Sequence, residues 1–182
     1  RNKEFYNAYM NGTLDIYAFL DFQLKPLSRH DMNELSTWHE QFMSRKILPM
    51  ISERARVEVS RAVGSADFVA LITATNSFVT APIAQELGIT HLIATEPEMK
   101  NGVYTGKVKG TPCFREGKVT RLHQWLAEQG LSWGDIHSSR FYSDSHNDLP
   151  LLQMVSEPVA VDPDEVLRAH AGLNQWPIVS LR

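Results

Sequence analysis

The sequence has a single cysteine, Cys113, among 182 residues, which excludes a disulfide framework and a cysteine-based zinc site. Such sparse cysteine is typical of a reducing compartment, so we expect a cytoplasmic protein. No apolar run reaches the roughly 18 residues of a membrane span. The formal net charge of −3 provides no excess of positive charge for a nucleic-acid surface. We therefore expect neither a membrane nor a nucleic acid as a partner.

Hydrophobic residues make up 43% of the chain, enough for a substantial core. In residues 1–63 they recur at helical spacing, which predicts short helices packed as a small bundle. In residues 64–182 short apolar runs alternate with helical patterns, and the run at residues 68–72 is typical of a strand buried on both faces. The pattern predicts an α/β fold, with a mainly parallel sheet in residues 64–182 and a helical domain in residues 1–63.

Turn and capping residues predict several element boundaries. Asn101 followed by glycine is a strong hairpin signal. Thr13 and Asp31 are expected to cap two helices of the N-terminal bundle, and Pro49 is expected to open another.

Residues 141–150 are the most informative segment. Asp144 follows the expected strand at residues 141–143, and Asp148 falls in the first turn of the next helix, so the two carboxylates point at one place. Two converging carboxylates need a positive neighbour, and Mg²⁺ prefers such oxygen ligands. The plain alternative is a helix cap followed by a surface aspartate.

Two further residues are expected near the carboxyl ends of strands. Thr73 follows the strand at residues 68–72, where its hydroxyl and the backbone of Ala74 suit a phosphate; an ordinary polar cap is the alternative. Lys118 opposes the dipole of the helix that it begins, which indicates an anion nearby unless it is a solvated surface lysine. Arg115, nearby in the chain, is interpreted as a solvated residue, with contact to a substrate as the alternative. Ligands of open α/β sheets bind at these strand ends, so the set predicts phosphoryl chemistry.

These segments resemble the motifs of the haloacid dehalogenase (HAD) superfamily, in particular its subfamily IB, which includes phosphoserine phosphatase-like and histidinol-phosphatase-like enzymes. Residues 71–76 are similar to the second family motif, residues 116–119 to the third and residues 142–152 to the fourth. The resemblance implies a Rossmann-like core in residues 64–182. Residues 1–63 resemble the helical cap that such enzymes insert between their first and second motifs.

The resemblance also implies a role for each site residue. Thr73 and the Ala74 backbone would bind phosphoryl oxygens, Lys118 would neutralise the nucleophile and the phosphoryl group, and Asn147 would lie near the phosphate.

The two aspartates of the fourth motif would serve the metal. Asp144 would ligate Mg²⁺, and Asp148 would ligate it or orient Lys118. The implied catalytic residues are thus Thr73, Lys118, Asp144 and Asp148.

One family motif is missing from the sequence. The first motif is an apolar strand followed by Asp-x-Asp-x-Thr, whose first aspartate forms an aspartyl-phosphate. No such motif occurs here, and Asp15 and Asp21 lie in helical pattern. The sequence also starts at Arg1 without an initiator methionine. We therefore expect the nucleophile upstream of residue 1, and we expect residues 1–182 alone to be inactive and poorly stable.

The resemblance implies a Mg²⁺-dependent phosphomonoester hydrolase acting on a small phosphorylated metabolite, with phosphoserine and histidinol phosphate as candidates. The alternative is a non-catalytic, anion-binding remnant of the same fold. A phospho-accepting signalling domain is a third class, against which the long helical insert argues.

Overall fold

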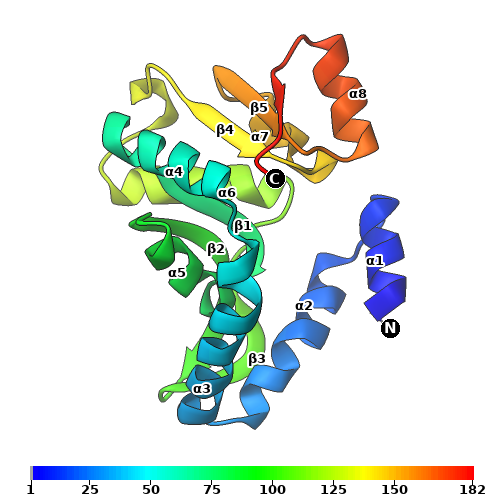
Figure 1. Ribbon diagram of the computed structural model, residues 1–182. Coiled ribbons are helices and arrows are strands. Elements are labelled where there is room, and N and C mark those ends of the chain that lie inside the picture. The colour runs from blue at the N-terminus through cyan, green and yellow to red at the C-terminus, as the bar shows by residue number, and fades with distance from the viewer. Residues whose placement is uncertain (1) are drawn as a thin grey trace.

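The computed structural model describes residues 2–182, which form helices around two small sheets (Figure 1). The first sheet has the order β1-β2-β3, with β1 (Ala70–Asn76), β2 (His91–Lys100) and β3 (Val103–Lys109). The second has the order β4-β5-β6, with β4 (Arg140–Ser143), β5 (Glu157–Val161) and β6 (Ile178–Val179). All pairs are parallel except β2–β3, which is the hairpin predicted from Asn101. The expected mainly parallel α/β fold class is confirmed.

Helices precede and connect the strands. The N-terminal ones are α1 (Asn2–Met10), α2 (Ile16–Leu24), η1 (Lys25–Arg29), α3 (Met32–Phe42), η2 (Met43–Ile47), η3 (Leu48–Met50) and α4 (Glu53–Ser65). The later ones are α5 (Ser77–Glu86), α6 (Glu116–Glu128), η4 (Trp133–Asp135), η5 (His146–Asp148), α7 (Leu149–Leu152) and α8 (Glu165–Leu173). Within residues 2–182 every helix is too short or too polar to cross a membrane.

Side-chain caps set where the N-terminal helices begin. Asp31 caps α3 and forms a capping box with the glutamate three residues on, as predicted. The cap predicted at Thr13 is wrong, because the carboxylate of Asp15 accepts the first free N–H groups of α2. The start predicted at Pro49 is also wrong: this proline lies in η3, and the Ser52 hydroxyl caps α4.

Strand β1 runs further than its apolar run predicts. The prediction ended the strand at residue 72, whereas β1 continues to Asn76. Its regular pairing with β2 stops at Thr73, and the register shifts before the next pair at Asn76. The side chain of Asn76 then caps α5. Thr73 therefore lies at the end of the regular ladder, and the helix starts later than expected.

Each of the two sheets has an unpaired edge strand at one end of its strand order. Among the described residues, β1 pairs only with β2, and β4 pairs only with β5. The second sheet has its own small core, which packs α7 and α8 against β5; its buried members are Leu152, Ala160, Leu167 and Ala171. Each sheet is thus supported locally rather than by a continuous ladder between them.

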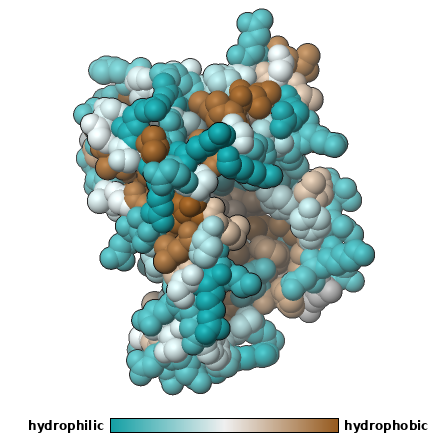
Figure 2. Space-filling view, in the orientation of Figure 1, coloured by the Kyte–Doolittle hydropathy of each residue, from teal (hydrophilic) through white to brown (hydrophobic). Residues whose placement is uncertain are grey.

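The helices before β1 lie in two places: most are beside the first sheet, and the last of them is near the second. Helices α1 to α3 form an arm beside the sheets, whereas α4 lies near β4 (Figure 1). The hydroxyl of Tyr142 in β4 donates to Glu58 in α4 at 2.6 Å. On the face shown in Figure 2, hydrophobic surface lines a hollow between the arm and the sheets. The division into a cap at residues 1–63 and a core at residues 64–182 stays a proposal.

The β2–β3 hairpin reaches the helical arm and packs on α2 and η1. Gly106 in β3 has φ +80°, and a Cβ there would lie 3.2 Å from the Cα of Lys25 and 3.0 Å from the hydroxyl of Ser28. Because the positive φ disfavours a side chain and an added Cβ would be crowded, glycine allows this close approach of strand and helix backbone.

Candidate active site

Lys118 and Asp148 form a buried ion pair at the start of α6. Only 6% of Lys118 and 7% of Asp148 is exposed, and the Lys118 Nζ lies 2.7 Å from Oδ1 of Asp148. The other carboxylate oxygen accepts a 2.6 Å hydrogen bond from the hydroxyl of Ser143, the last residue of β4. Unpaired buried charges are strongly unfavourable, so each group depends on the other. The solvated alternative for Lys118 is therefore wrong.

A tight turn places Lys118 in this position. The Gly117 N–H donates to the carbonyl of Phe114 at 2.9 Å, and the Lys118 N–H donates to the carbonyl of Arg115 at 2.9 Å. A Cβ on Gly117 would lie 2.1 Å from the carbonyl oxygen of Pro112. Only glycine fits there, so the turn fixes where the Lys118 side chain leaves the backbone.

Cys113 connects the end of β1 to this ion pair. Its thiol has a pKa raised to about 11, chiefly by burial, and the positive charge of Lys118 and a backbone hydrogen bond with Thr73 only partly oppose the shift. The end of β1 and the start of α6 therefore adjoin at Cys113. The Thr73 hydroxyl accepts the Thr75 N–H at 3.1 Å, which holds the irregularly paired end of β1 that contains Ala74.

Asp144 directly follows β4 and is exposed. Within residues 2–182 its carboxylate has no hydrogen-bond or ion-pair partner, and its backbone carbonyl accepts the Asp164 N–H at 2.8 Å. No group of three or more His, Cys, Asp or Glu residues in this part of the chain is placed to hold a metal. Mg²⁺ commonly uses one or two carboxylates beside waters and substrate phosphate. Asp144 fits that pattern, whereas both oxygens of Asp148 already have protein partners.

His146 begins η5 and is held by Asp164, the residue that caps α8. One oxygen of Asp164 lies 2.8 Å from Nδ1 of His146 and accepts the backbone N–H of the same residue at 2.7 Å. Burial raises the pKa of Asp164, but hydrogen bonds from Leu167 and His146 outweigh burial, so the pKa lies below its ordinary value. The carboxylate thus fixes the orientation of the imidazole ring.

Arg115 occupies a strained position at the entrance to α6. Its φ of 51° and ψ of −122° correspond to the first central residue of a type II′ turn, where glycine is usual. Such a conformation costs a non-glycine residue about 1–3 kcal/mol. Its Nε donates to Oδ1 of Asn147 at 2.9 Å, and Asn147 is buried. The interpretation of Arg115 as a solvated residue is therefore wrong.

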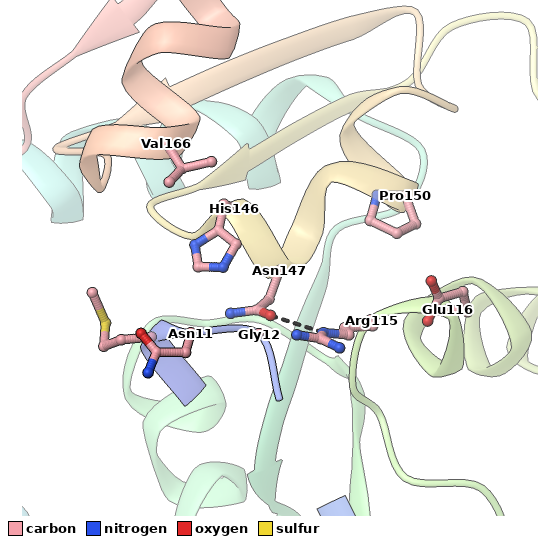
Figure 3. Close-up of a pocket in the computed structure, with 9 residues that line it drawn as sticks. Asn11, Gly12, Arg115, Glu116, His146, Asn147, Pro150 and Val166 are labelled. Carbon is pink, nitrogen blue, oxygen red and sulfur yellow. Dashed lines mark hydrogen bonds between the residues drawn. The ribbon is translucent and has the colours of Figure 1, made fainter. Parts of the chain in front are cut away.

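A pocket of about 440 Å³ opens beside the Arg115–Asn147 pair. Figure 3 shows Arg115 reaching toward Asn147, with Asn11 and Gly12 of the α1–α2 connection close by. His146 also lines the pocket. The helical arm, the entrance to α6 and η5 thus form one pocket.

Helix α1 is bound to the same region. The hydroxyl of Tyr9 lies 2.8 Å from the Ser145 hydroxyl, and the Tyr9 ring packs on Phe114 with 6.1 Å between ring centroids. The fold therefore brings Lys118, Asp148 and the end of β1 together, while Asn147 faces the neighbouring pocket.

Sequence reasoning missed several residues of this site. Ser143 was expected only as part of a strand, although its position just before Asp144 and five residues before Asp148 was a usable signal. The Tyr9–Ser145 contact joins residues 136 positions apart, so no local pattern could have indicated it.

A comparison with family models matches residues 3–153 to the haloacid dehalogenase-like hydrolases. A histidinol-phosphatase of Neisseria meningitidis serogroup C is 45% identical over 183 residues, covering 100% of this chain and 82% of the relative. A phosphoserine phosphatase of Mycobacterium tuberculosis is 32% identical over 149 residues, covering 82% of this chain and 47% of the relative.

Solved structures give the same fold. A Bordetella pertussis protein of unknown function has a TM-score of 0.94 and 47% identity, covering 100% of this chain and 82% of the other. A substrate-bound phosphoserine phosphatase has a TM-score of 0.67 at 16% identity, covering 99% of this chain and 79% of the other, which speaks for the fold alone. The expected HAD-type phosphatase class is confirmed, and the chain belongs to the haloacid dehalogenase-like hydrolase family.

Proposed function

We propose that this chain carries most of the active site of a Mg²⁺-dependent phosphomonoesterase that acts on a small phosphorylated metabolite. The observation that carries the proposal is the buried Lys118–Asp148 ion pair, 2.7 Å long; the exposed Asp144 directly follows β4, four residues before Asp148 in the chain. A buried ammonium suits a site that must bind an anion, and a free carboxylate directly after a strand suits one that must also bind a cation.

Each residue then has a defined task. Lys118 neutralises charge on the phosphoryl group and on its acceptor, and Asp148 positions Lys118. The hydroxyl of Thr73, the backbone of Ala74 and the side chain of Asn147 hydrogen-bond phosphoryl oxygens. These assignments remain proposals for all five residues.

Asp144 would hold the divalent cation, with Asp148 as a second ligand only if it releases a protein partner. Mg²⁺, when bound, supplies positive charge beside the phosphoryl oxygens. The helical arm closes the site through the contact between Tyr9 and Ser145, which limits access of bulk water.

The reaction requires a nucleophile that residues 1–182 lack in recognisable form. We propose that a phosphoryl group passes to an aspartate outside these residues, forming an aspartyl-phosphate that water then hydrolyses. Histidinol phosphate is the first candidate substrate, because the relative that is 45% identical is named a histidinol-phosphatase. Phosphoserine is the second.

The test compares the full natural protein with a polypeptide of residues 1–182. The full protein should release phosphate from histidinol phosphate or phosphoserine, lose this activity with a chelator and regain it with Mg²⁺. Asp144→Asn should raise the Mg²⁺ concentration needed for half-maximal activity. Metal-dependent turnover by residues 1–182 alone would refute the external nucleophile. A full protein that binds phosphate without turnover would instead support the non-catalytic alternative.

A further inference from the structure

Arg115 keeps a long charged side chain at a position where the backbone favours glycine. The turn at Phe114–Gly117 requires a positive φ at Arg115, and the observed value is 51°. Local conformational preference therefore does not explain this residue. A strained non-glycine residue beside a pocket is a reason to look for a function.

The contacts of Arg115 direct its guanidinium into that pocket. Its Nε is occupied by Asn147 at 2.9 Å. One terminal nitrogen lies close to Gly12, where an added Cβ would come within 3.1 Å of it. Among the described residues, neither terminal nitrogen has a hydrogen-bond acceptor, and the group has no ion-pair partner. Figure 3 shows the guanidinium at the pocket wall beneath Asn147.

The pocket has the size of a small ligand, and polar side chains form part of its wall. Its volume of about 440 Å³ suits a metabolite, and Asn147 links it to the proposed phosphate-binding group. Its walls also include His146 and the exposed Glu116. A guanidinium with two free terminal nitrogens is suited to bind an oxyanion with two parallel hydrogen bonds.

We infer that Arg115 is a substrate-binding residue that holds an oxyanion of the phosphomonoester. This oxyanion is either the phosphoryl group itself or a carboxylate on the alcohol portion. The inference rests on the proposed phosphatase function. It adds a residue that the family motifs do not include, and it gives the adjoining pocket a part in binding the substrate.

Arg115→Gly is a sharp test because it removes the guanidinium while relieving the backbone. We expect the variant, in the full natural protein, to melt near the wild-type temperature. The KM should rise about tenfold or more, as expected for loss of a charged hydrogen bond. Gln175→Gly is the matched control: Gln175 also has a positive φ, 57°, and is exposed. It should leave the KM unchanged.

Three esters distinguish the two sources of the oxyanion. Phosphoserine carries a carboxylate, whereas phosphoethanolamine and histidinol phosphate do not. If Arg115 binds the phosphoryl group, the KM for all hydrolysed esters and the inhibition constant of inorganic phosphate should rise together. If it binds a carboxylate, only the KM for phosphoserine should rise. Either result supports the inference.

Unchanged KM values together with unchanged inhibition by phosphate would overturn the inference about Arg115. A loss in kcat alone would also overturn it, because that result would indicate that Arg115 only shapes the turn before Lys118. If Arg115→Gly melts far below wild type, Arg115→Lys is the deciding variant, because it keeps the charge but lacks the planar guanidinium. KM values of Arg115→Lys equal to those of the wild type would then refute the inference. If wild type hydrolyses none of the esters, the proposed function fails first. The role of Arg115 is then tested by measuring the binding of inorganic phosphate to the wild type and to Arg115→Gly. Equal affinity of the two proteins, or no binding by either, refutes that role.

Discussion

At the scale of single residues, the two aspartates of the fourth motif differ in their surroundings. Asp148 is buried and compensates the charge of Lys118, whereas Asp144 is exposed and lacks a protein partner within residues 2–182. The sequence placed both at one site, because their spacing after a strand is a local pattern. Spacing alone did not say which aspartate would pair with Lys118, and only the family resemblance pointed to Asp148.

This difference predicts opposite effects on stability and function. Asp148→Asn should lower the free energy of unfolding by about 3 kcal/mol, because it leaves the Lys118 ammonium buried without a counter-charge. Asp144→Asn should change it by no more than about 0.5 kcal/mol while reducing activity. Urea denaturation of the two variants in the full natural protein measures both values. Equal, small losses would show that the Lys118–Asp148 pair is not buried in solution.

Cys113 gives a prediction about pH. Burial raises the pKa of its thiol to about 11, whereas an unfolded thiol ionises near about 8.5. The folded state therefore keeps a proton that the unfolded state loses, so this contribution to stability is complete below the unfolded pKa and is lost as pH rises through about 11. Urea midpoints between pH 8 and 11 should fall less steeply in Cys113→Ala than in wild type. Parallel curves would contradict the shift.

Arg115 illustrates where reasoning from sequence ended. In the polar segment before Gly117 and Lys118, a solvated arginine was the favoured interpretation and contact with a substrate the alternative. Its actual environment depends on Asn147, 32 residues away, and on Gly12 in the helical arm. Contacts between loops so distant in the chain leave no periodic signal in the sequence.

At the scale of elements, strands and helices were predicted well where apolar periodicity and caps agree, as at Asp31. The end of β1 was misplaced because the irregular pairing after Thr73 lets the strand continue through polar residues. The start of α6 is determined in another way, by the close approach of Gly117 to the carbonyl of Pro112.

Gly117→Ala should therefore disrupt the entrance to α6. The added Cβ would meet a backbone oxygen at 2.1 Å, so the turn must open, with an expected loss of at least about 2 kcal/mol in the free energy of unfolding. Lys118 would move with it, so activity should fall even where the protein stays folded. Gly64→Ala in α4 is the control, because nothing lies within 4 Å of its added Cβ. Equal stability of the two variants would contradict the close packing at Gly117.

At the scale of the whole molecule, the sheets are two separate three-stranded units within residues 2–182. The alternation of strands and helices predicted the fold class. It did not predict that the sheets are separate, because strand pairing joins segments that are distant in the sequence. The unpaired edges of β1 and β4 offer hydrogen-bonding groups to solvent or to another strand.

A polypeptide of residues 1–182 should consequently unfold over a broad range of temperature and should associate as its concentration rises. Hydrogen exchange should be faster for amides on the outer edges of β1 and β4 than for amides on the edges that pair β1 with β2 and β4 with β5. Calorimetry and exchange mass spectrometry measure these properties. A sharp melt that does not depend on concentration would contradict the prediction.

The contact between Gly106 and η1 has a consequence for engineering. Because the strand backbone rests directly on Lys25 and Ser28, the helical arm and the hairpin fit each other as a matched pair. A chimera that takes its arm from another family member should fold only when the donor's hairpin is transplanted with it. A change of substrate preference would then require exchange of both the helical arm and the β2–β3 hairpin, and exchange of the arm alone would not suffice.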